Sequence, residues 1–124
     1  MATKTQCIYI VDDDASVRKA LARLFKASGL PVETFGSAVE FLESHKEGPS
    51  CCLVLDVRMP GMTGLDLQKK LTARKSILPV IFITAHEDEI ARKQAMDNGA
   101  VAWFMKPVNE EDLLSAVAAV AQRQ

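Results

Sequence analysis

The sequence predicts an α/β fold built on a single doubly wound parallel sheet with helices on both faces. Short apolar runs alternate five times with segments in which apolar residues recur every three or four positions. This alternation is typical of strands and helices that follow one another in a parallel α/β protein. The chain has 124 residues, 48% of them hydrophobic, which is enough for one domain with one core. We therefore expect a single domain over residues 1–124, without a linker or a second domain.

The first two strand–helix units open the chain. A strand is expected at Cys7–Val11, followed by a helix over Ala15–Ser28 whose apolar residues keep the spacing of one helix face. Asp14 is a candidate N-cap for this helix, and Gly29 provides its stop. The second strand, Val32–Phe35, is the weakest of the five.

Capping boxes mark the starts of the next two helices. Ser37 with Glu40, and Thr63 with Asp66, each pair a hydroxyl with an acid three residues later. The third and fourth strands are predicted from short apolar runs bounded by proline and glycine. They are Cys52–Leu55, after a turn at Gly48-Pro49, and Val80–Ile83, after Pro79.

The last two helices differ in how firmly they should be held. The fourth, about Glu87–Asn98, is the least apolar of the five and should shift more easily than its neighbours. The fifth strand, Val101–Met105, precedes a helix capped by Asn109, three residues before Asp112. The residues expected to face the core are Ile90, Ala91, Ala95 and Met96 in the fourth helix and Leu113, Leu114, Val117 and Val120 in the fifth.

Composition narrows the classes of function. The net charge is −1, with 15 basic and 16 acidic residues, so no basic surplus argues for direct nucleic-acid binding. No apolar stretch reaches the roughly 20 residues of a membrane span, and Met1–Gln6 lacks a signal-peptide core. Cys7, Cys51 and Cys52 form no C-x-x-C motif. We expect them to be reduced core residues of a cytoplasmic protein, with a reactive thiol as the alternative.

Polar side chains follow four of the five apolar runs, each at the point where the run ends. Asp12 and Asp13 follow the first run, Asp56 the third, Thr84 closes the fourth and Lys106 the fifth. The carboxyl ends of parallel strands meet at one edge of a sheet, and the flavodoxin-like strand order 2-1-3-4-5 sets strands one and three side by side. We therefore expect three acids, one hydroxyl and one ammonium to form a single site.

This set of groups suits a cation and a phosphoryl group. Three neighbouring carboxylates repel one another, and Mg²⁺, which prefers hard oxygen ligands, would remove the conflict. Asp56 stands alone on the central strand and is the best candidate for a carboxylate nucleophile that becomes an aspartyl-phosphate. Lys106 and Thr84 would contact phosphoryl oxygens, and the small Ala85 leaves room for the group.

Each of these residues also has a plainer interpretation. Asp14 is more simply a helix cap, and Thr84 alone would be a strand-end hydroxyl bonded to backbone. Lys106 alone would be a solvated surface charge, and Asp56 alone a turn residue. The combination at four separate strand ends is much more specific than any single member.

Four stretches of the chain stand in a recognisable order and spacing. They are residues 11–14 (VDDD), residues 56–64 (DVRMPGMTG), Thr84-Ala85 and Lys106-Pro107. In these stretches the chain resembles the receiver domain of two-component response regulators, and the likeness covers essentially its whole length. Asp56-x-Arg-Met-Pro together with Thr84-x-His86 is most similar to the FixJ-type subgroup of transcriptional regulators.

The resemblance implies a role for each matching residue. Asp56 would accept phosphate from a phosphohistidine of a sensor histidine kinase. Asp13, Asp56 and the backbone carbonyl of Arg58 would bind Mg²⁺ directly, and Asp12 would act through water. Thr84 and Lys106 would sense the phosphoryl group. The resemblance also implies a cis bond before Pro107 and a switch role for Trp103, at a position that more often holds Tyr or Phe.

The resemblance also implies how a signal leaves the domain. Phosphate would draw Thr84 toward it, Trp103 would turn inward, and the fourth helix would repack. The face of the fourth helix, fifth strand and fifth helix would then control a homodimer or a DNA-binding output domain, which is missing from this chain. Such a domain promotes its own phosphorylation and dephosphorylation but is not an enzyme. We further expect Arg58 and His86 to flank the phosphoryl group and control water entry, with exposed loop side chains as the plainer interpretation of both.

Other classes fit less well. An enzyme of the haloacid-dehalogenase type needs a second acid two residues after the nucleophile, where Arg58 stands. Asp12 to Asp14 would repel the phosphate of a flavodoxin-type cofactor, and no P-loop motif is present. The strongest rival is an unphosphorylated pseudo-receiver that acts purely as an interaction module.

Overall fold

The structure is a computed structural model that describes residues 7–44 and 51–123. Five parallel strands form one sheet in the order β2-β1-β3-β4-β5, which confirms the predicted fold class and strand order. The expected turn at Gly48-Pro49 lies outside the described residues. In chain order the elements are β1 (Cys7–Val11), α1 (Ala15–Ala27), β2 (Val32–Phe35), α2 (Ala38–Ser44), β3 (Cys51–Asp56), α3 (Gly64–Ala73), β4 (Val80–Thr84), α4 (Glu89–Asp97), β5 (Ala102–Met105) and α5 (Glu110–Arg123).

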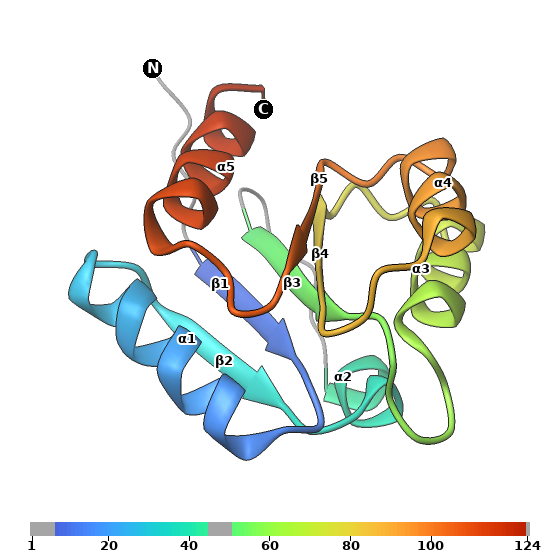
Figure 1. Cartoon of the computed structure of the whole chain (residues 1–124), viewed down its shortest axis with the longest axis horizontal. Coiled ribbons are helices and arrows are strands. Elements are labelled where there is room, and N and C mark those ends of the chain that lie inside the picture. Colours follow the sequence, from blue (N-terminus) through green and yellow to red (C-terminus); the bar gives the residue numbers. More distant parts are fainter. Residues whose placement is uncertain (1–6, 45–50, 124) are drawn as a thin grey trace.

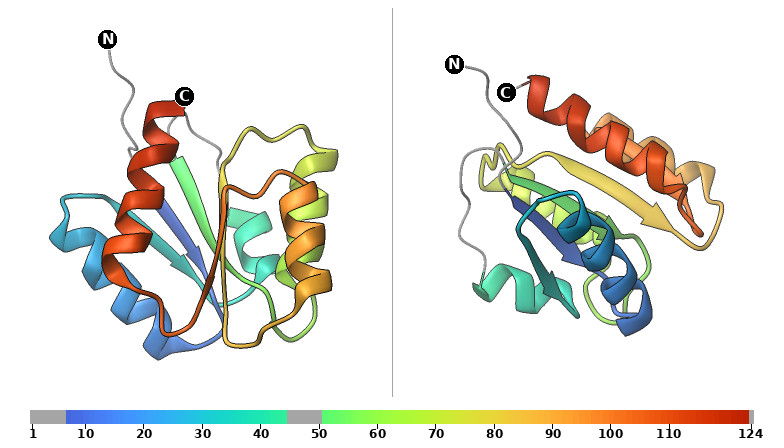
Figure 2. Two further views of the ribbon diagram at one scale, coloured as in Figure 1. Left: turned by 45° about the horizontal axis from the view of Figure 1, so that its top comes forward. Right: turned by 90° about the vertical axis from the view of Figure 1, so that its left-hand side faces the viewer.

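The helices cover both faces of the sheet. Figures 1 and 2 show α1 and α5 on one side and α2, α3 and α4 on the other. Successive strand residues therefore enter different apolar clusters: Leu53 and Leu55 pack toward α2 and α3, and Cys52 and Val54 toward α1 and α5. Because both faces of β3 are covered, all of its residues are buried, which explains its continuous apolar sequence.

The strand register brings the polar strand ends together. Val11 is the register partner of both Phe35 and Leu55, Asp56 that of Ile83, and Thr84 that of Met105. The residues that end or directly follow β1, β3, β4 and β5 consequently lie at one edge of the sheet. The lower ends of the strands in Figure 1 form this edge.

Side-chain caps set most of the helix starts. The Asp14 carboxylate accepts the N–H groups of Ser16 and Val17, which confirms it as the N-cap of α1. Thr63 and Asp66 form both bonds of the predicted capping box before α3. The other predicted caps also accept a backbone N–H each: Ser37 from Glu40 at 3.1 Å, and Asn109 from Asp112 at 2.9 Å.

The prediction for α4 was partly wrong. The helix begins at Glu89 rather than Glu87, because the Asp88 side chain caps it by accepting the Ala91 N–H at 3.0 Å. Ala91 is buried as expected, but Ile90 is 75% exposed and Met96 41% exposed. The buried stripe consists of two alanines, Ala91 and Ala95, four residues apart, so the larger side chains beside each of them face solvent.

The cysteine prediction was wrong for two of the three residues. Cys7 and Cys51 form a disulfide between the first residues of β1 and β3. The two residues are register partners with Cα atoms 4.7 Å apart, a proximity that their sequence separation of 44 conceals. Cys52 is free and buried as expected, and burial raises its pKa to about 12. Among the described helices, none has the length and apolar character needed to cross a membrane.

Candidate functional site

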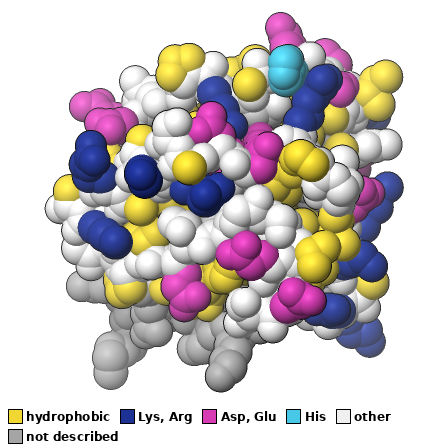
Figure 3. Space-filling view, turned by 90° about the horizontal axis from the view of Figure 1, so that it is seen from below, with side chains coloured by type: hydrophobic (Ala, Val, Ile, Leu, Met, Phe, Trp, Pro, Cys, Tyr) yellow, Lys and Arg dark blue, Asp and Glu magenta, His cyan; other side chains and the backbone are white. Residues whose placement is uncertain are grey.

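Three acids meet at the carboxyl edge of the sheet, as predicted. Asp12, Asp13 and Asp56 each offer a carboxylate oxygen, and these oxygens all lie within 4.8 Å of one another. Asp12 and Asp56 are buried, whereas Asp13 is exposed. Figure 3 views the molecule from this end and shows acidic and basic side chains close together across it.

Lys106 supplies the positive charge of the cluster. Its ammonium nitrogen lies 2.9 Å from Asp12 Oδ2 and 3.5 Å from Asp56 Oδ1. Its backbone N–H donates to the carbonyl of Thr84 at 2.7 Å, which fixes the start of the side chain. Burial opposes the charge on Lys106, but its pairing with the Asp12 carboxylate, and then with that of Asp56, raises its pKa. Lys106 is therefore an ion-pair residue within the site.

The two buried acids are held differently. Asp12 Oδ1 accepts the Asp14 N–H at 2.9 Å, whereas Oδ2 faces Lys106 without a hydrogen bond of ordinary geometry. Burial, then the charges of Asp12 and Asp13, raise the pKa of Asp56 to about 6, although Lys106 counteracts part of the rise. Three acids against one ammonium leave an excess of negative charge.

The donor set fits a hard divalent cation. Carboxylate oxygens are the ligands that Mg²⁺ prefers, and it commonly retains waters beside one or two of them. A cation would relieve the repulsion that raises the pKa of Asp56 and would give the buried Asp12 Oδ2 a further partner. These residues could therefore hold a metal ion.

Thr84 is buried and its hydroxyl is bound to backbone. Oγ1 accepts the His86 N–H at 3.2 Å and lies 3.2 Å from the His86 carbonyl, to which it donates. In this structure Thr84 is therefore a strand-end hydroxyl bonded to backbone, the plainer of its two interpretations. Ala85 and His86 are exposed at the start of the loop to α4, so the hydroxyl ties this loop to the end of β4.

Arg58 contacts a residue that the sequence interpretation did not single out. Its guanidinium lies 4.0 Å from Asp88 Oδ2, and both side chains are partly exposed. Asp88 Oδ1 also caps α4, so one carboxylate joins the loop after β3 to the first turn of α4. The sequence signal that could have identified Asp88 is the preference for aspartate at helix N-caps, because Asp88 stands three residues before Ala91.

Gly64 is a second residue whose importance emerges from the structure. Its N–H donates to the Val57 carbonyl at 2.9 Å, which draws the start of α3 against the end of β3. A Cβ on Gly64 would overlap the Asp56 carbonyl oxygen and crowd Val57. Only glycine permits this approach, so the position of the Asp56 backbone depends on Gly64.

Trp103 lies on β5, which β4 separates from the strand that ends at Asp56. It is half-buried on β5, pairs in register with Phe82 and has its ring centroid 5.7 Å from that of Phe82. It also packs against the apolar cluster that includes Ala95 of α4. The bond between Lys106 and Pro107 is cis, as the resemblance implied.

Comparison with known proteins identifies the family. The profile of the response regulator receiver domain matches residues 8–118. The chain belongs to this family. The FixJ-type resemblance is also confirmed: Transcriptional regulatory protein FixJ of Bradyrhizobium diazoefficiens is 40% identical over 124 residues, covering 100% of this chain and 60% of that protein.

Other relatives extend the same picture. Nodulation protein W of Bradyrhizobium diazoefficiens is 43% identical over 122 residues, 98% of this chain and 54% of that protein. Response regulator protein TodT of Pseudomonas putida is 44% identical over 119 residues, 96% of this chain and 52% of that protein. This receiver domain thus spans about half the length of the curated relatives it matches.

Solved structures agree with the fold. The response regulator StyR superposes with a TM-score of 0.89 at 44% identity, covering 96% of this chain and 60% of that chain. FixJ-N superposes with a TM-score of 0.87 at 34% identity, covering 96% and 95% of the two chains.

Proposed function

We propose that this receiver domain accepts a phosphoryl group on Asp56 from the phosphohistidine of a sensor histidine kinase. The observation that carries the proposal is a buried carboxylate with a raised pKa, surrounded by two further acids and one ammonium. In the transfer, an Asp56 carboxylate oxygen bonds to phosphorus as the bond between phosphorus and the histidine nitrogen breaks. The imidazole leaves with the bonding electron pair.

Mg²⁺ is the proposed cofactor. Asp13, Asp56 and the Arg58 backbone carbonyl would hold it directly, and Asp12 would act through water. When bound, the ion supplies positive charge that offsets the negative charge of the acids and of the phosphoryl group. The three carboxylates that meet in this site support the assignment.

Lys106 and Thr84 are the proposed sensors of the phosphoryl group. Lys106 already lies 3.5 Å from Asp56 Oδ1 and would pair with a phosphoryl oxygen once Asp56 is modified. Thr84 would give up its two bonds to His86 and donate to another phosphoryl oxygen. The loop that begins at Ala85 would then be released from the end of β4.

The signal would leave through α4. Only Ala91 and Ala95 of this helix are buried, so its position is weakly defined by packing. Trp103 would turn inward behind Thr84, and the surface of α4, β5 and α5 would change. Exposed Ile90, Met96 and Met105 lie on these elements and would contribute to a homodimer or to contact with an output domain.

The longer relatives support an attached output. FixJ carries the name of a transcriptional regulatory protein and is longer than this chain. We infer that residues 1–124 are the receiver part of a cytoplasmic transcriptional regulator whose DNA contacts lie in another domain. Arg58 and His86 would control water entry to the phosphoryl group, and the domain would promote its own phosphorylation and dephosphorylation without being an enzyme.

The decisive test is phosphorylation of the purified domain by acetyl phosphate, read by intact mass. With Mg²⁺ the wild type should gain one phosphoryl group, and Asp56→Asn should gain none. Asp14→Asn is the matched control, because Asn caps a helix as well as Asp and Asp14 lies outside the acid cluster. The proposal would be overturned if the wild type gained no phosphoryl group, as expected of a pseudo-receiver. It would also be overturned if Asp56→Asn still gained one.

The single tryptophan provides a second readout. Mg²⁺ and then acetyl phosphate should each change Trp103 fluorescence, and Asp56→Asn should lose the phosphate-dependent part. The half-lives of the phosphorylated Arg58→Ala and His86→Ala variants test the role in water entry. Unchanged half-lives in both would remove that part of the proposal.

A further inference from the structure

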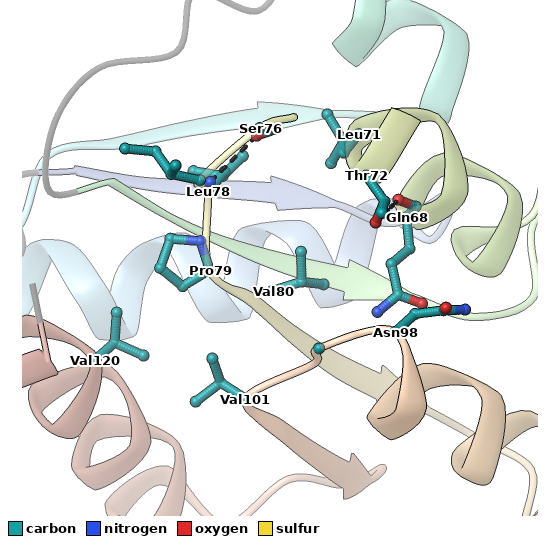
Figure 4. Close-up of a pocket in the computed structure, with 12 residues that line it drawn as sticks. Gln68, Leu71, Thr72, Ser76, Leu78, Pro79, Val80, Asn98, Val101 and Val120 are labelled. Carbon is teal, nitrogen blue, oxygen red and sulfur yellow. Dashed lines mark hydrogen bonds between the residues drawn. The ribbon is translucent and has the colours of Figure 1, made fainter. Parts of the chain in front are cut away.

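A hollow lies at the end of the sheet opposite to the acids. Its volume is about 430 Å³, and it opens where β4 begins and where the chain leads from α4 into β5 (Figure 4). This volume falls within the roughly 300–1,000 Å³ of small-molecule pockets. Its lining residues come from α3, the loops before β4 and β5, the first residue of β4, and α5: Gln68, Leu71, Thr72, Ser76, Ile77, Leu78, Pro79, Val80, Asn98, Gly99, Val101 and Val120.

The lining is uncharged. Aliphatic side chains such as Leu71, Val80 and Val101 share it with polar groups, and none of the lining residues is acidic or basic. Two of its polar side chains already have backbone partners: the Thr72 hydroxyl donates to the Gln68 carbonyl at 3.0 Å, and Ser76 Oγ accepts the Leu78 N–H at 3.2 Å. A charged ligand would therefore lose its hydration without gaining a counter-charge.

Gln68 carries a polar atom without a partner. The residue is 2% exposed, and its Nε2 donates to the Ala95 carbonyl of α4 at 2.9 Å. This bond fixes the orientation of the amide, because a carbonyl can accept only from the nitrogen. The other end of the amide, Oε1, is buried without a hydrogen bond. Figure 4 shows the Gln68 side chain extending from α3 toward the region of Asn98.

We propose that this hollow binds a small uncharged molecule with an apolar body and one O–H or N–H donor. The apolar body packs against Leu71, Val80 and Val101, and the donor gives Gln68 Oε1 its missing hydrogen bond. Because Oε1 is covered, a lining side chain must rotate as the donor enters. Asn98 is exposed at the C-cap of α4 and has room to do so. The site shares no residue with the acid cluster.

Two probes with the same ring test the requirement for a donor. Cyclohexanol carries an O–H donor, and cyclohexanone has only an acceptor. Titration of the methyl-labelled domain with cyclohexanol should shift the NMR signals of Leu71, Val80 and Val101, with cyclohexanone binding about ten-fold more weakly. Equal affinities, or shifts confined to other methyl groups, would overturn the proposal.

Variants locate the site independently of the probe chemistry. Val101→Phe fills the hollow and should abolish binding of both probes. Ala20→Phe makes a comparable change in a separate apolar hollow, between α1 and the β5–α5 loop, and should leave binding unchanged. Retained binding in Val101→Phe, or loss in Ala20→Phe, would contradict the assignment.

Removal of the acceptor gives a third comparison. Gln68→Met keeps the length of the side chain but has no amide, so the two probes should bind it with equal affinity. The variant also loses the bond to Ala95, and its fold must be checked by circular dichroism. If it does not fold, the wild-type comparison and Val101→Phe still decide the question. A persistent preference for the alcohol in folded Gln68→Met would overturn the role of Oε1.

Discussion

The ammonium of Lys106 lies 2.9 Å from a buried carboxylate oxygen of Asp12, so the cluster contains its own counter-charge. Lys106→Met should leave Asp12 and Asp56 without this partner. We expect the free energy of unfolding to fall by about 1–3 kcal/mol near neutral pH, measured by urea denaturation.

The matched control for this loss is Lys93→Met. Lys93 lies 3.3 Å from Asp97, but both side chains are well exposed, so the change should cost less than about 0.5 kcal/mol. Equal losses in the two variants would mean that burial does not strengthen the Lys106 pairs.

The raised pKa of Asp56 makes a prediction about pH. Since the folded pKa is about 6, above the value near 4 of an unfolded aspartate, the folded state binds more protons between these two values. This group therefore makes the domain less stable as pH rises from about 4 to 6, and its full cost persists above that range. Asp56→Asn should raise the unfolding free energy by about 1–2 kcal/mol near pH 8, with little effect near pH 4.

Asp14, whose pKa is lowered rather than raised, provides the control for Asp56. Hydrogen bonds from Ser16 lower the pKa of the exposed Asp14, so its charged form is favoured by folding at neutral pH. Asp14→Asn should therefore give no stabilisation near pH 8. A gain in Asp14→Asn as large as that in Asp56→Asn would show that the gain does not come from burial of the Asp56 charge.

Gly64 should tolerate no side chain. Gly64→Ala places a Cβ against the Asp56 carbonyl oxygen, so the backbone of the proposed phosphorylation residue must move. We expect a loss of about 2–4 kcal/mol of stability, together with slower acetyl-phosphate labelling.

Gly61→Ala separates steric overlap from backbone strain. Gly61 has φ +76° but open space around the position of a Cβ, so the substitution should cost only about 1–2 kcal/mol. A larger loss in Gly61→Ala than in Gly64→Ala, measured by thermal unfolding, would contradict this account of Gly64.

The Cys7–Cys51 bond predicts a response to reductant. Without reductant, the denatured protein should show one free thiol, that of Cys52, and with reductant all three. A bond that closes a loop of this length should stabilise by about 2–4 kcal/mol, so reductant should lower the unfolding midpoint. Cys7→Ala should abolish this dependence and Cys52→Ala should retain it; three free thiols without reductant would exclude the bond.

Structural features that depend on a local sequence pattern were predicted correctly. Asp14 and Thr63 cap helices as expected, because capping depends on neighbours within four residues. The meeting of Asp12 with Asp56 was predictable because parallel strands end at one edge of the sheet.

Predictions failed where packing or distant pairing decides the outcome. Ile90 was expected in the core by its apolar character, but the two alanines of α4 turn it to solvent. The link between Cys7 and Cys51 depends on strand register, which the spacing of cysteines does not reveal. The Arg58–Asp88 ion pair likewise joins two loops that only the fold brings together.

The alanine contacts of α4 have a consequence for how the helix can move. A large side chain that leaves its place exposes a cavity, and the cost grows by about 24 cal/mol per Å³ of empty volume. Ala91 and Ala95 would each leave only a methyl-sized gap. Sliding of α4 across the sheet is therefore opposed mainly by polar contacts that reach it from outside, the Arg58–Asp88 ion pair and the Gln68 amide. These contacts can break one at a time, so α4 can shift in separate steps rather than continuously.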